Sequence, residues 1–120
     1  MAKNLVLEFS DGDEVLEGIR QACDEHNVQF GQFIEGKGPV KEFTLFSHDY
    51  QRQTFRGDYV LDVVSGQVKK MRDERQVDFR GVILRRGTHA THQGRFTNIV
   101  AGEGLRIVLH LNDPSTIRIE

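Results

Sequence analysis

The sequence has few of the features that tie a small protein together covalently or place it in a membrane. It has one cysteine, Cys23, in 120 residues, which excludes an intrachain disulfide and a cluster of thiolate metal ligands. No apolar stretch approaches the roughly 18 residues that suggest a transmembrane helix. Residues 1–9 contain one lysine and no cleavage site of small residues, so we expect no signal peptide. A soluble, cytoplasmic protein without membrane contact is therefore expected.

Length and charge narrow the classes further. A chain of 120 residues falls in the single-domain range, so we expect one domain over residues 1–120. The net charge of −2 argues against a strong nonspecific polyanion binder. Residues 1–64 hold 6 basic and 12 acidic side chains, whereas residues 65–120 hold 10 basic and 6 acidic ones. Either these are ordinary solvated strand faces, or the second half builds an anion-binding face.

The clearest predicted element is an amphipathic helix within residues 11–27. Its apolar face is made of Val15, Leu16, Ile19, Ala22 and Cys23, with charged residues opposite. Asp11 and Glu14 have the spacing of a capping box, which predicts where the helix starts. Because Cys23 lies on the apolar face, we expect a buried thiol and no catalytic nucleophile.

The rest of the chain has the pattern of short strands. They are expected at residues 5–9, 28–34, 40–46, 59–64, 77–84, 91–100 and 105–111. Turn-forming residues predict a turn at Gly36-Lys37-Gly38-Pro39, a polar loop at 48–57 and an exposed turn at 69–75. This order predicts an α+β fold class, a mostly antiparallel β-sheet with one main N-terminal helix packed on it.

The order of several motifs resembles the plant-and-prokaryote-conserved (PPC) domain family. Residues 12–45 are similar to the opening of that family, in which G-E-E precedes a helix, a strand and G-I-G-A. Residues 57–61 and Ser65-Gly66 resemble its G-E-(aromatic)-E-(apolar) and S-(apolar)-(S/T)-G blocks. The resemblance covers nearly the whole chain. It implies a PPC-like fold, a homotrimer and a stand-alone prokaryotic type without an AT-hook, a type that carries a DNA-binding label but has no established activity.

The chain departs from the family where members commonly carry H-x-H on one strand and G-G-H on the next, a trio suited to a divalent metal. The resemblance places Asp78 and Arg80 in the first motif and Gln93-Gly94-Arg95 in the second. Guanidinium groups stay protonated and cannot ligate a metal, so we predict neither metal nor cofactor there.

An anion suits these side chains better than a metal does. Arg80 and Arg95, with Lys37 or the N–H groups of the Gly36–Gly38 turn, could hold a carboxylate or phosphate. The alternative is a structural salt bridge between Asp78 and one of the two arginines. Both interpretations remain open at this stage.

His89 and His92 suggest a second possible metal site. Residues three apart on a strand face opposite ways, and zinc needs three or four converging ligands. We therefore expect surface histidines, although the sequence alone does not decide whether they bind metal.

Three functions follow from these observations. The first is a trimeric binding or regulatory module with a small anion or a partner at an inter-subunit cleft. The second is DNA binding through a basic run that acidic residues interrupt: Lys69, Lys70, Arg72 and Arg75. The third, an enzyme using the inter-subunit cleft, is weakened by the loss of the histidine trio, and we assign no catalytic residue.

Overall fold

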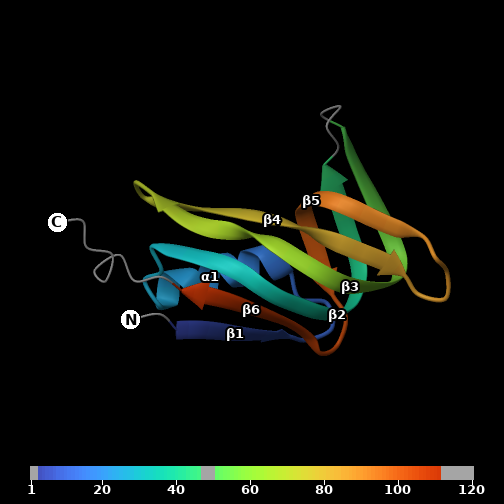
Figure 1. The fold of residues 1–120 in the computed structure, drawn as a ribbon, viewed down its shortest axis with the longest axis horizontal. Helices are drawn as coiled ribbons and strands as arrows, with labels where there is room; N and C mark the ends of the chain where they lie inside the picture. Colours follow the sequence, from blue (N-terminus) through green and yellow to red (C-terminus); the bar gives the residue numbers. More distant parts are fainter. Residues whose placement is uncertain (1–2, 47–50, 112–120) are drawn as a thin grey trace.

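The computed structural model describes residues 3–46 and 51–111. Its elements in chain order are β1 (Lys3–Phe9), α1 (Val15–Glu25), β2 (Phe30–Phe46), β3 (Arg52–Met71), β4 (Glu74–Arg85), β5 (Thr91–Ala101) and β6 (Leu105–Leu111). The predicted α+β fold, a mostly antiparallel sheet with an N-terminal helix, is confirmed (Figure 1). No helix in the described ranges is long and apolar enough to cross a membrane.

The sheet is organised around the long strand β2. Its strands follow the order β1-β6-β2-β3-β4-β5, and β2 also pairs with β5. The first half of β2 lies between β6 and β3, whereas its second half, from Val40 to Phe46, lies between β3 and β5. At this second half the strands β2 to β5 close into a ring, while the other end of the sheet stays open (Figure 1).

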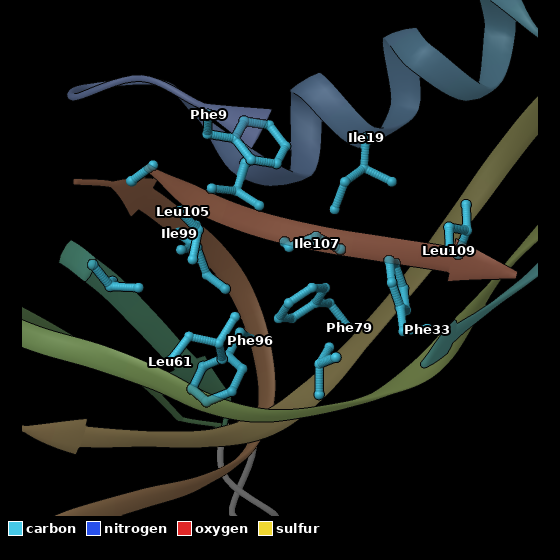
Figure 2. Packing of buried hydrophobic residues seen from close by; sticks show 14 of the residues in the cluster. Phe9, Ile19, Phe33, Leu61, Phe79, Phe96, Ile99, Leu105, Ile107 and Leu109 are labelled. Carbon is cyan, nitrogen blue, oxygen red and sulfur yellow. The ribbon is translucent and has the colours of Figure 1, made fainter. Parts of the chain in front are cut away.

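The core lies between α1 and the inner face of the sheet. Val15, Ile19 and Cys23 of α1 are fully buried, and Figure 2 shows Ile19 pointing toward Ile107 of β6. The strand expected at 105–111 is β6, and its four apolar residues at odd positions are all buried, as is Val108. Edge-to-face packing of Phe33 on Phe79, with ring centroids 5.0 Å apart, joins β2 to β4.

The buried thiol of Cys23 confirms the sequence expectation for that residue. Desolvation raises its pKa from 9.0 to about 11, although the nearby charge of Arg75 acts in the opposite direction. At neutral pH the sulfur is therefore protonated and unreactive, as befits a core residue.

The predicted turn at residues 36–39 is wrong, because this stretch runs through the middle of β2. Gly38 pairs with Leu61 of β3 and has a φ of 140°. A Cβ on Gly38 would lie 2.7 Å from the Cα of Leu105, and one on Gly36 would lie 3.0 Å from a methyl group of Val64. The glycines therefore allow neighbouring strands and core side chains to approach closely, and they do not reverse the chain.

The predicted loop at 48–57 is also wrong where the structure describes it. Strand β3 begins at Arg52, which pairs with Phe46, and the pairing continues to Arg56 opposite Glu42. Only Phe55 in this stretch is partly buried. This stretch has no alternation of apolar and polar residues, so the sequence does not predict a strand here. The strand forms because the backbone pairs with β2. Residues 48–50 lie outside the described part of the chain.

Two local expectations need correction. The N-cap residue of α1 is Glu14, and its side chain forms no capping hydrogen bond. The predicted capping box that starts at Asp11 is therefore wrong. Asp13 instead accepts a hydrogen bond of 2.8 Å from the N–H of Ser10. The exposed turn expected at 69–75 is shorter, since β3 continues to Met71 and β4 begins at Glu74.

Gly38 and Gly104, two of the glycines with a positive φ, offer a matched test of close approach. Gly104 has a φ of 89° and open space around its Cα, whereas Gly38 faces the backbone of β6. We expect Gly104→Ala to cost about 1–2 kcal/mol of unfolding free energy for the left-handed conformation. Gly38→Ala should cost about 3 kcal/mol or more, because steric conflict adds to the strain. Equal losses in chemical denaturation would contradict this explanation.

Candidate anion-binding site

Two arginines face each other across neighbouring strands on the outward side of the sheet. Phe79 and Ile83 of β4 are buried, which turns Asp78 and Arg80 outward. Arg80 lies directly opposite Arg95 of β5 in the register. Their side chains are 58% and 52% exposed. Like charges in this position repel each other, so the pair favours an anion between them.

A single carboxylate serves both guanidinium groups. One oxygen of Asp78, Oδ1, is 3.1 Å from Nε of Arg80 and 3.8 Å from Nε of Arg95. The salt bridge considered from the sequence is therefore present, and it involves two arginines. Two positive charges against one negative charge leave an excess of positive charge at this point. Within the described part of the chain, both arginines contact Asp78 through Nε, which leaves their terminal nitrogens available to donate.

These three residues line an open groove of about 490 Å³. Its remaining walls come from Arg20 of α1, Gln67 of β3 and residues 74–77 of β4, so the lining holds four arginines against two carboxylates. Arg20 itself donates to Glu17 at a distance of 2.8 Å. No sequence pattern points to Arg20 or Gln67, because their contribution depends on how α1 and β3 lie beside β4.

Lys37, Gly36 and Gly38 do not join the groove. Lys37 pairs with Arg106 of β6, and Gly38 pairs with Leu61, which itself lies opposite Ile83. These positions are therefore displaced along the sheet from Asp78 and Arg80. The expectation that they would complete the site depended on a turn that the chain does not make.

The basic run at the end of the β3–β4 hairpin is divided between two roles. Lys69 and Arg72 are exposed. The side chain of Arg75 is only 7% exposed, and its Nε donates to the backbone oxygen of Val28 at 2.8 Å. Its guanidinium also contacts Asp24 of α1. Arg75 therefore links β4 to the C-terminal end of α1, and its charge is not available at the surface.

The two histidines lie in different surroundings. His89 is exposed in the connection between β4 and β5. His92 is half-buried, and its ring centroid lies 4.4 Å from that of Phe55 and 5.3 Å from that of Phe43. The expectation of a surface histidine is therefore wrong for His92. Within residues 3–46 and 51–111, no three His, Cys, Asp or Glu side chains are grouped so that they could hold a metal.

Comparison with known proteins identifies the family. Residues 1–110 match the model of the Plants and Prokaryotes Conserved (PCC) domain. The chain belongs to the PCC-domain family. No curated protein is significantly similar to it in sequence.

Solved structures share the PCC-domain fold at low identity. A plant- and prokaryote-conserved protein from Pyrococcus horikoshii is 17% identical with a TM-score of 0.76, covering 92% of this chain and 80% of that one. A candidate DNA-binding protein from Bacteroides thetaiotaomicron is 16% identical with a TM-score of 0.83, covering 92% and 79%. A metal-containing protein from Archaeoglobus fulgidus is 12% identical with a TM-score of 0.74, covering 91% and 78%. These likenesses show the fold alone.

The groove of this PCC-domain chain does not fit a metal ion. Two of the three side chains that converge there, Arg80 and Arg95, are guanidinium groups without a lone pair to donate. Asp78 is left as a single oxygen ligand, and its Oδ1 is already engaged by both arginines.

Proposed function

We propose that this PCC-domain protein is a binding module that holds a carboxylate or phosphate group between Arg80 and Arg95. The observation that carries the proposal is the cross-strand pair itself. Both side chains are more than half exposed, and their guanidinium groups share one carboxylate oxygen. Such a pair is incompletely neutralised, and an incoming anion completes it.

The chemistry of the guanidinium group explains how an anion binds beside Asp78. Each arginine contacts Asp78 through Nε. Each guanidinium has five N–H donors in a planar fork, so its terminal nitrogens can still form a bidentate pair with a carboxylate or phosphate. Asp78 then holds the forks in place and also competes with the ligand.

The same outward face supports assembly as a homotrimer, with the groove at a subunit boundary. The row that begins with Asp78 and Arg80 on β4 continues with Val82 and Leu84, which are only partly buried. Val63 lies opposite Val82 and is 51% exposed. An exposed valine beside two partly buried apolar side chains favours cover by another protein surface, and the resemblance to the PPC family implies three subunits.

Substitutions in the groove should change anion affinity in opposite directions. Arg80→Ala should weaken binding of phosphate or succinate at least about tenfold, because a hydrogen bond to a charged group contributes about 1.5–3 kcal/mol. Asp78→Asn should strengthen binding, because it removes the competing charge. The measurement is calorimetric titration. Arg86→Ala is the control, because Arg86 is similarly exposed and pairs with Asp58 outside the groove. Equal affinities in all four proteins would refute the site.

Assembly can be tested on the apolar row. Val63→Lys should reduce the molar mass measured by light scattering from that of a trimer to that of a monomer, because a buried lysine without a partner is costly. Val6→Lys on β1 changes a similarly exposed valine and should leave the mass unchanged. A monomeric wild-type protein, or a trimer that persists in Val63→Lys, would contradict this interface.

DNA binding is the second candidate function. It is favoured by the solved relative from Bacteroides thetaiotaomicron, a candidate DNA-binding protein. It also has support in the placement of Lys69, Lys70 and Arg72 at one end of the β3–β4 hairpin. Arg75 is omitted from this surface because its side chain is occupied by α1 and Val28.

A mobility-shift titration separates the two functions. If the hairpin end contacts phosphates, affinity should fall with salt at a logarithmic slope of about −0.9 for each contact. Replacing Lys69 and Lys70 by alanine should reduce that slope, whereas Arg86→Ala should not. Absent binding at low salt, or a slope that the lysine substitutions leave unchanged, would exclude this surface.

A further inference from the structure

Strand β4 has an unpaired edge between Glu74 and Asp78. Pairing with β5 runs only from Phe79 opposite Phe96 to Leu84 opposite Thr91. Beyond Phe96, β5 turns away and pairs with β2. In the part of the chain that the structure describes, no other strand takes its place, and Figure 1 shows the β3–β4 hairpin running on past β5.

The register shows which backbone groups face this open edge. The N–H of Lys70 donates to the oxygen of Gln29 at 2.9 Å, so the backbone of Lys70 is turned toward β2. Neighbouring residues of an antiparallel strand bond to opposite sides, and Lys69 therefore bonds toward β4, where its partner is Gln76. It follows that the next residue of β4, Val77, directs its N–H and C=O away from β3 and toward the groove, which it lines.

The open edge and the anion groove are parts of one surface. Residues 74–78 of β4 line the groove together with Arg20 on one side and with Arg80 and Arg95 at its end. Neither a proline nor a register shift interrupts this stretch, although both commonly protect strand edges. Five residues of extended chain span roughly 16 Å, which is enough for a peptide to reach several of the arginines at once.

We propose that this edge accepts an extended acidic segment of a partner protein, which adds a strand beside β4. Backbone hydrogen bonds to the edge around Val77 would supply affinity, and carboxylates on alternate residues, which share one face of the added strand, would bind Arg80 and Arg95. The inference rests on the proposed anion function, because its side-chain anchors are the same two arginines.

The negative charge beside β1, at the opposite edge of the sheet, supports an acidic partner at β4. Among the strands of residues 3–46 and 51–111, β1 pairs only with β6, so none of these strands covers its outer side. A groove between β1 and α1 has four carboxylates in its lining, those of Glu8, Asp13, Glu14 and Glu17. An acidic strand is repelled there and attracted at β4, so charge alone selects between the two edges.

The decisive experiment is fluorescence anisotropy with a labelled peptide in which glutamate and valine alternate. We expect binding, and none of a peptide in which lysine replaces glutamate. Methylating the backbone nitrogens of one alternate set should weaken binding at least about tenfold, because each lost hydrogen bond leaves its partner unpaired. Methylating the other set should have no effect. Equal effects of the two sets would overturn the proposal.

Variants of the protein separate this inference from the proposed function. Val77→Pro removes an N–H that faces the groove and none that β3 uses, so it should abolish peptide binding and leave phosphate binding intact. Arg80→Ala should reduce both. Phosphate binding that depends on Arg80, without peptide binding to the wild type, would overturn only the inference. Loss of the Arg80 effect on phosphate would overturn the proposed function.

Two further outcomes also decide the question. If Val77→Pro fails to fold, as judged by circular dichroism, the methylated peptides on the wild-type protein decide the question. If the acidic peptide does not bind and Val77→Pro lowers the molar mass in light scattering, a second copy of the chain occupies the edge, which overturns the acidic-peptide proposal.

Discussion

Backbone pairing along β2 is the constraint on which the rest of the structure depends. One strand has partners on both sides for most of its length, but one of the two changes from β6 to β5 part-way along. The change requires shifts of register near Ile34 and Lys41, and it requires glycine where β2 passes close to Leu105. Because β5 pairs with β2 as far as Ala101, its pairing with β4 ends at Phe96. The open edge and the groove are consequences of this exchange of partners.

Electrostatics then decides what the groove can hold. Arg80 and Arg95 are placed opposite each other by the β4–β5 register, and Asp78 reaches both because it lies two residues before Arg80 on the same face. The fold supplies the positions, and the side chains decide the chemistry. In a PCC-domain member these guanidinium groups favour carboxylates and phosphates and exclude direct metal coordination by two of the three residues.

The sequence predicted the elements whose apolar residues recur on one face. Ile19 and Cys23 mark the buried face of α1, and Ile107 does so for β6. The Gly36–Gly38 stretch was misread because glycine serves both turns and close backbone approach, and only the neighbouring strands tell them apart. The start of β3 was missed because both of its faces are largely exposed.

The candidate site was predictable to a similar degree. Strand alternation places Asp78 and Arg80 on one face, and the family resemblance points to Arg95. Lys37 was wrongly included because its place depends on pairing with β6, which no local pattern reveals. Arg20 was missed for the corresponding reason, since the helix packing brings it to the groove. Arg75 looked like part of a solvated basic run, and only its contacts with Val28 and α1 show otherwise.

The buried thiol of Cys23 can report on movements that separate α1 from the sheet. The sequence contains no other sulfhydryl, and this one is held between α1 and the sheet with its pKa raised to about 11. An alkylating reagent near neutral pH can modify it only in molecules whose helix has come away from the core. The rate of modification therefore measures how often the helix detaches, and no engineered cysteine is needed for the measurement.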